Sequence, residues 1–163
     1  MSSTETHETT LDELSVFTRR IREAKTSDDL RRLLNQMNDL KLRLPDDVFM
    51  TALYNYLRGV LYIKGAVSGI GWVASGGESL YYAIDLLEFA EKGFSGLMTN
   101  PSTVLLQFRQ DCVYESMVAV TTLQAWGRRL PENVPDTGLL PAKSRRVIER
   151  HRSHGYPMRS RFA

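Results

Sequence analysis

The sequence contains a single cysteine, Cys112, which excludes an intramolecular disulfide. The first ten residues contain neither lysine nor arginine, so we expect neither a secretory signal nor a transit peptide at the start. The uncharged, glycine-rich run 65–77 has 13 residues, fewer than the roughly 20 that a membrane-spanning helix needs. We therefore expect no stable membrane insertion and a reducing cytoplasmic location, or a virion if the protein is viral.

Residues suited to catalysis are scarce. His7 lies in a polar N-terminal stretch, and His151 and His154 lie among arginines that would repel a metal cation. Cys112 falls on an apolar helical face and is predicted to be a small core residue. Residues 69–74 match a dinucleotide-binding pattern, but helical periodicity precedes them where that pattern requires a strand. We predict no enzymatic activity, no metal site and no cofactor.

One strongly apolar stretch, residues 45–74, predicts the central helix of the fold. Its apolar residues recur at helical spacing on two adjacent stripes, so that Thr51, Asn55, Arg58 and Gly59 are left to face water. We expect the helix to continue to about Ile63 and an irregular or partly helical segment to follow, because glycines are dense beyond Lys64.

Start and stop signals place four further helices around this one. Capping residues at 10–13, 26–29 and 75–78, and the Asn-Pro pair at 100–101, mark helix starts. Glycines 93, 96 and 127 mark helix ends. No strand-like alternation is present. The prediction is an all-α fold, a bundle of about five helices formed by residues 10–127, preceded by a disordered acidic arm over 1–9.

Charge divides the chain into two unequal parts. Residues 1–127 contain 12 Lys/Arg and 16 Asp/Glu, a net charge of −4, whereas residues 128–163 contain 9 and 3, a net charge of +6. Three prolines between residues 128 and 142 predict an extended linker. Residues 143–163 are then predicted to form an extended, arginine-rich tail, and a tail of this kind suits an anionic partner.

The arginine-rich tail supports the leading functional hypothesis, contact with RNA or DNA phosphates. The guanidinium group matches phosphate oxygens, and Tyr156 and Phe162 are interleaved for base stacking. We expect a self-associating, non-catalytic assembly protein, such as a nucleocapsid-like component. The glycine-rich segment is expected to contribute Gly65, Gly69, Gly71 and Trp72 to self-association. The expected nucleic-acid contacts are Lys143, Arg145, Arg146, Arg150, Arg152, Arg159 and Arg161.

Three alternatives remain open at the sequence level. The protein can be an adaptor or assembly factor whose basic tail binds an acidic protein partner, and nucleic acid then plays no part. It can be a small helical enzyme or ligand carrier with a pocket lined by Tyr54, Tyr62, Trp72 and Tyr81. The tail can also be a solvated segment without a specific role.

Overall fold

The computed structural model describes residues 16–43, 47–70, 76–97, 103–129 and 140–154, and within them it contains helices and no strand. This confirms the all-α prediction. Residues 16–23 are helical and lead into the named helices. These are α2 (Ser27–Arg43), α3 (Val48–Ser68), α4 (Gly76–Gly96), α5 (Thr103–Arg129) and α6 (Leu140–His154).

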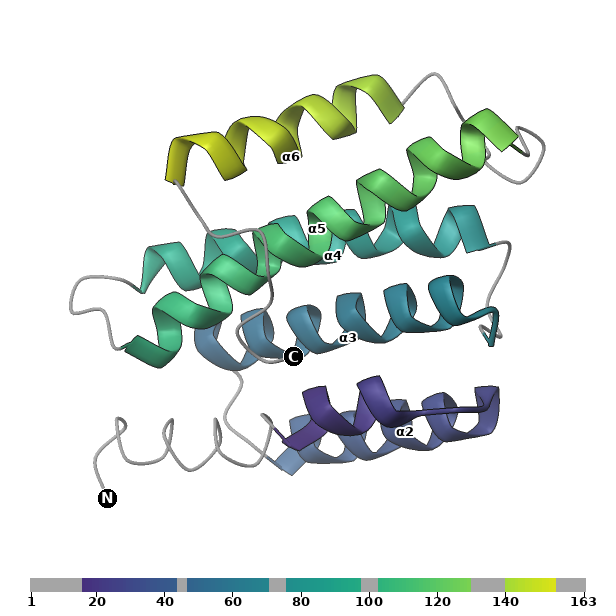
Figure 1. Cartoon of the computed structure of the whole chain (residues 1–163). Coiled ribbons are helices and arrows are strands. Elements are labelled where there is room, and N and C mark those ends of the chain that lie inside the picture. The colour runs from purple at the N-terminus through teal and green to yellow at the C-terminus, as the bar shows by residue number, and fades with distance from the viewer. Residues whose placement is uncertain (1–15, 44–46, 71–75, 98–102, 130–139, 155–163) are drawn as a thin grey trace.

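Successive helices run up and down beside one another (Figure 1). Residues 16–23 and α2 form one side of the bundle, α3 lies next to them, α4 and α5 follow, and α6 covers the opposite side. Helix α3 contacts α2, α4 and α5, so it has the central position predicted for it. One hydrophobic cluster includes residues from all of these helices.

Two helix starts are fixed by the capping chemistry of their sequences. The Asp29 amide donates to the Thr26 hydroxyl at 3.1 Å, and the Asp29 carboxylate accepts from the Thr26 amide at 3.1 Å. This reciprocal pair confirms the predicted start of α2 and separates it from the helical residues 16–23. Asp47 caps α3 by accepting from the Met50 amide at 2.8 Å. The signals at 10–13 and 100–101 lie outside the described residues.

Two helices extend beyond their predicted ends. Helix α3 continues past Ile63 to Ser68, where Gly69 adopts a left-handed conformation with φ 70°. The Gly69 amide then donates to the Ala66 carbonyl and the Ile70 amide to the Gly65 carbonyl, which satisfies the last carbonyls of the helix. Helix α5 passes through Gly127 and ends at Arg129. A glycine ends a helix where the chain turns, and composition alone does not locate that turn.

The core is organised by contacts between aromatic rings of three helices. Phe94 of α4 stacks on Phe108 of α5 with ring centroids 5.8 Å apart, and it meets Phe49 of α3 edge-on at 6.4 Å. Phe108 in turn meets Tyr56 of α3 at 5.2 Å. All four residues are buried. The chain of rings therefore joins α3, α4 and α5 at the centre of the bundle.

Glycine allows α3 and α4 to approach closely at two points. A Cβ at Gly59 would lie 2.7 Å from the Leu87 side chain. Gly59 is therefore buried against α4, and the prediction that it faces water is wrong. A Cβ at Gly93 would lie 2.8 Å from the Ala52 Cβ. The Ala52 Cβ is attached directly to a helix backbone and cannot rotate away, whereas the Leu87 side chain can.

Replacing Gly93 with alanine is therefore expected to push α3 and α4 apart. We expect Gly93→Ala to lower the free energy of unfolding by about 1–2 kcal/mol, because the steric cost exceeds the gain in helix propensity. Gly96→Ala is the matched control, since a Cβ at Gly96 meets nothing within 4 Å. Urea denaturation measures both variants. Equal stability of the two variants would show that the helices accommodate the extra methyl group.

The predicted extended tail is wrong for residues 143–154, which belong to helix α6. Residues 140–142 and 128–129, assigned to the linker, are also helical. The physical reason is a helical spacing of residues that pack inward. Val147 is fully buried, Ser144 is buried, and Leu140 packs against the core. Residues 1–9, 130–139 and 155–163 lie outside the described residues.

Candidate nucleic-acid interface

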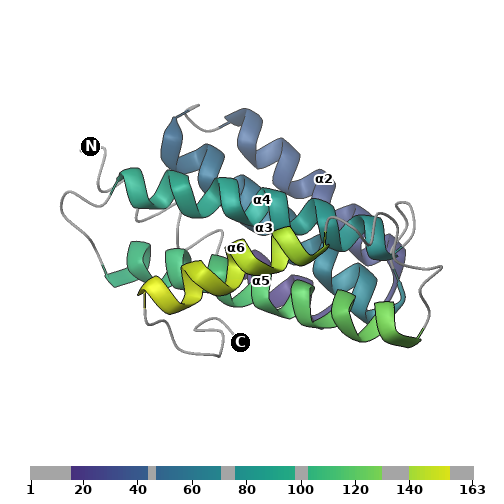
Figure 2. The same cartoon turned by 90° about the horizontal axis from the view of Figure 1, so that it is seen from above.

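Helix α6 lies across α4 and α5, as Figure 2 shows from above. One of its faces is attached to acidic residues of α4 by ion pairs. Lys143 Nζ lies 2.6 Å from Asp85 Oδ1, and Arg150 Nη1 lies 3.4 Å from Glu88 Oε2 and 4.0 Å from Glu91 Oε2. Three carboxylates at successive turns of α4 therefore form ion pairs with basic residues spaced along α6.

Glu88 is the centre of this arrangement. It also pairs with Arg146 at 3.4 Å and with Lys92 of its own helix at 3.3 Å. Partial burial would raise the pKa of Glu88, but the Arg150 and Arg146 cations, together with Lys92, hold that pKa below its ordinary value. The carboxylate is thus stabilised in its charged form, and it favours the docked position of α6.

The predicted nucleic-acid contacts differ in their ion pairs and in their exposure. Lys143 and Arg150 face α4, and their side chains are 15% and 17% exposed. Arg146 remains 52% exposed beside Glu88. Arg145 and Arg152 are exposed and, within the described part of the chain, pair with no carboxylate. Arg159 and Arg161 lie outside the described residues.

The residues predicted for self-association are only partly described. Gly65 is buried within α3, and Gly69 ends that helix in a left-handed conformation. Gly71 and Trp72 lie outside the described residues. Val67 is 52% exposed in the last turn of α3. Gly69 thus has a local structural role, and its part in self-association stays a prediction.

A buried polar cluster that the sequence did not reveal lies between α3, α5 and residues 16–23. The buried Tyr56 hydroxyl donates to the carboxylate of Asp111, which is 1% exposed. Glu115 lies one turn further along α5 and pairs with Arg22 at 2.9 Å. Lys64 donates to the Arg22 carbonyl at 2.8 Å. The cluster therefore connects three separate segments through charged hydrogen bonds.

Burial dominates the electrostatics of this cluster. Burial and the neighbouring Asp111 charge raise the pKa of Glu115 to about 7, although the Arg22 cation opposes the shift. Burial, with the same carboxylate, also raises the pKa of the Tyr56 hydroxyl well above its ordinary value. Cys112 is fully buried, as predicted, and burial raises the pKa of its thiol. A protonated, buried thiol is unreactive as a nucleophile.

The tyrosines proposed to line a ligand pocket are arranged differently from the prediction. Tyr54 and Tyr62 gather with Tyr82 around the guanidinium of Arg58. Tyr81 packs against the hydrophobic core, and Trp72 lies outside the described residues. The spacing of Tyr54, Arg58 and Tyr62, four residues apart on α3, signals this contact in the sequence. No spacing in the sequence indicates that Tyr82, which lies on α4, contacts Arg58.

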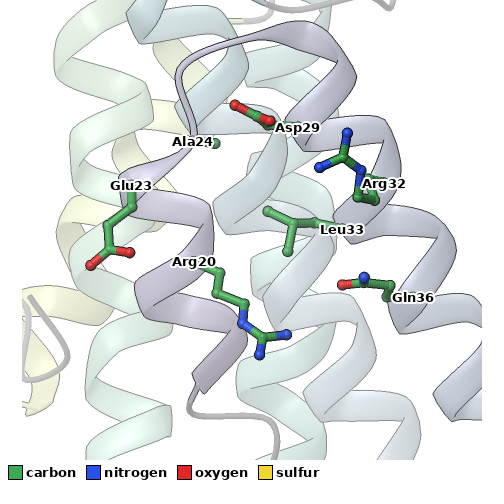
Figure 3. A pocket seen from close by; sticks show the side chains of 7 residues that line it. All are labelled: Arg20, Glu23, Ala24, Asp29, Arg32, Leu33 and Gln36. Atoms are coloured by element: carbon green, nitrogen blue, oxygen red, sulfur yellow. The ribbon is translucent and has the colours of Figure 1, made fainter.

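An open recess of about 430 Å³ lies elsewhere, between residues 16–24 and α2 (Figure 3). Arg20 and Arg32 lie on either side of Leu33, and Glu23 and Asp29 add negative charge. The Asp29 carboxylate accepts amide hydrogen bonds from Lys25 and Thr26, so it is committed to capping α2. Opposite charges at the rim give the recess no preference for a ligand of one charge.

Metal-binding clusters and membrane spans are both absent from the described residues. Among them, no group of three histidine, cysteine or acidic side chains is placed to hold a metal ion. No helix in the described ranges is long and apolar enough to cross a membrane. Comparison of the chain with protein-family models, with curated proteins and with solved structures returns no match.

Proposed function

We propose that this protein is a non-catalytic, self-associating helical assembly protein that binds nucleic acid through α6 and the basic residues that follow it. The observation that carries the proposal is the division of α6 into two basic faces. Its inner face is neutralised by the carboxylates of α4, while Arg145 and Arg152 project from the outer face without a carboxylate partner in the described part of the chain.

The packing of α6 against α4 supports the nucleic-acid part of this proposal. Arg145 and Arg152 are seven residues apart, so two turns of a regular helix place them on the same side. A packed helix holds their backbone in place, which lowers the entropy lost when they contact phosphates. Contacts of this kind follow charge and shape, and they carry no base sequence information.

We assign self-association to the end of α3, where Val67 is exposed. Light scattering after size exclusion measures the size of the assembly.

The salt dependence of binding tests the role of α6. If Arg145, Arg146, Arg152, Arg159 and Arg161 each neutralise one phosphate, the slope of log K against log salt is expected to be roughly −3.5 to −4.5. The double variant Arg145→Ala/Arg152→Ala is expected to bring this slope closer to zero by about 1.5. Fluorescence anisotropy with a labelled RNA duplex measures both slopes.

The matched control is Arg31→Ala/Arg32→Ala, which makes the same change in net charge on α2, at the other side of the bundle. We expect this variant to keep the wild-type slope. A flat slope for the wild-type chain would contradict the proposal. Equal effects of the two double variants would show that binding follows total charge and does not use α6.

A second candidate function, an adaptor for an acidic protein, has one observation in its favour. The inner face of α6 already binds an acidic helix face, that of α4. An acidic partner would have to displace α4 or use the outer arginines alone. Capture of an acidic partner by the wild-type chain and not by Arg145→Ala/Arg152→Ala, without nucleic-acid binding, would favour this function.

A further inference from the structure

Four residues of α3 and α4 form a compact group on the surface, which we call the tyrosine–arginine cluster: Tyr54, Arg58, Tyr62 and Tyr82. The Arg58 guanidinium carbon lies 5.4, 6.0 and 5.5 Å from the ring centroids of Tyr54, Tyr62 and Tyr82. Arg58 Nη2 also donates to the Tyr82 hydroxyl at 2.8 Å. Tyr62 and Tyr82 meet edge to face at 5.2 Å.

The cation of this cluster is held in position by tyrosines and, among the described residues, has no carboxylate partner. In the regions that the structure describes, the ring contacts and the side-chain hydrogen bond of Arg58 are to tyrosines, and Arg58 forms no ion pair there. Cation–π contacts and hydrogen bonding to tyrosine hold the guanidinium in place without neutralising its charge. Lys41 adds a second cation 4.5 Å from the Tyr54 ring centroid. The cluster therefore presents positive charge that a polyanion can neutralise.

An aromatic surface accompanies this charge. Tyr82 is 44% exposed, and Tyr54 and Tyr62 are half-buried. An exposed ring beside a fixed guanidinium matches a nucleotide, which offers a flat base and a phosphate. In a duplex the base faces are covered by neighbouring base pairs, so the ring contact is available only to a single strand. A protein partner would supply no matching negative charge unless it also carried acidic residues.

The position of the cluster connects it with α6. Tyr82 lies one turn before Asp85 on α4, and Asp85 holds Lys143 of α6. Helix α4 thus contacts Arg58 on one side and the basic helix on the other. A flexible strand can touch both surfaces, whereas a stiff duplex that follows α6 has no base free to reach Tyr82.

We propose that the tyrosine–arginine cluster is a contact site for single-stranded nucleic acid, with a base stacked on Tyr82 and a phosphate beside Arg58. This inference rests on the proposed function, because it assumes that α6 supplies the electrostatic contact. It adds a preference that α6 alone does not give: single strands are bound more tightly than duplexes of equal length.

The test uses the full chain and two fluorescein-labelled probes, an oligo(U) strand and an RNA duplex of the same length. Tyr82→Ala is expected to weaken oligo(U) binding about tenfold and to leave duplex binding unchanged. Tyr82→Phe keeps the ring and loses the hydroxyl, so it is expected to retain oligo(U) binding. Circular dichroism and thermal melting of both variants establish that they fold.

The outcomes separate this inference from the proposed function. Duplex binding that depends on Arg145 and Arg152, with oligo(U) binding unaffected by Tyr82→Ala, would overturn the inference and leave the proposed function standing. Oligo(U) binding that depends on Tyr82 but not on α6 would support the cluster and overturn the role of α6. Binding of neither probe, with a self-association that Tyr82→Ala removes, would overturn both and assign the cluster to a protein contact.

Discussion

Between pH 4.5 and pH 8, the wild-type chain is expected to lose about 3 kcal/mol of unfolding free energy relative to a Glu115→Gln variant. The cause is the buried carboxyl of Glu115, whose pKa rises from 4.5 in the unfolded chain to about 7 in the folded protein. Above pH 7 the folded chain must hold a charge that burial and Asp111 disfavour.

The direction of the effect follows from proton binding. Between the two pKa values the folded state binds more protons at this site than the unfolded state does, so stability falls as the pH rises. The contribution of Glu115 is fully present below pH 4.5 and is lost as the pH passes through about 7.

Urea denaturation of both chains at a series of pH values measures this difference. Glutamine keeps an oxygen that can accept from Arg22, so the variant loses the titration and retains a partner for the guanidinium. Carboxyls that do not interact with Glu115 titrate in both chains, and their contribution cancels when the two stability curves are subtracted. Parallel stability curves over the whole pH range would contradict an elevated pKa for Glu115.

Truncation of Phe94 is expected to destabilise the bundle strongly. Phe94→Ala removes a fully buried ring that contacts Phe49 and Phe108, and it is expected to lower the free energy of unfolding by about 4 kcal/mol. The loss combines two terms. One is the transfer free energy of the ring, and the other is the cost of the cavity that it leaves between the three helices.

Phe89→Ala provides the matched control on the same helix. Phe89 is 58% exposed, and we expect its truncation to change stability by no more than about 0.5 kcal/mol. Thermal or urea denaturation of the two variants gives the comparison. A similar, small effect of both substitutions would mean that Phe94 does not occupy the centre of the core.

The bundle could be predicted from the sequence because its helices carry their own signals. The stripe of apolar residues from Val48 to Leu61 repeats at the period of a helix, and Thr26 and Asp29 are spaced for a capping box. Helix ends were less predictable. Gly93 and Gly127, which were predicted to mark helix ends, lie inside helices. A glycine has the same composition signal whether it ends a helix or lies within one.

Helix α6 was missed because its charge is more conspicuous than its periodicity. Seven basic residues among residues 143–163 suggest a solvated tail, while Leu140, Ser144 and Val147 provide the spacing of a helical face. The decisive partners, Asp85 and Glu88, are more than fifty residues away in the sequence. Nothing local indicates that those acids face the arginines.

The two polar clusters show the same limit. Tyr54, Arg58 and Tyr62 share a helix and their contact can be read from spacing, but Tyr82 joins them only through the packing of α3 on α4. Tyr56, Asp111 and Glu115 are ordinary residues in the sequence. The raised pKa values of Tyr56 and Glu115 arise chiefly from burial, which depends on three segments coming together.

The up-and-down order of the helices has a consequence for how the chain folds. The principal packing partners are α2 with α3, α3 with α4, α4 with α5 and α5 with α6, which are neighbours along the chain. Such local contacts give a low contact order, which is typical of rapid folding. The pair of Arg22 with Glu115 spans 93 residues, so it closes a long loop in the chain. The buried polar cluster therefore joins the helical residues 16–23 to α5, and its ion pair can form only after α5 has been synthesised.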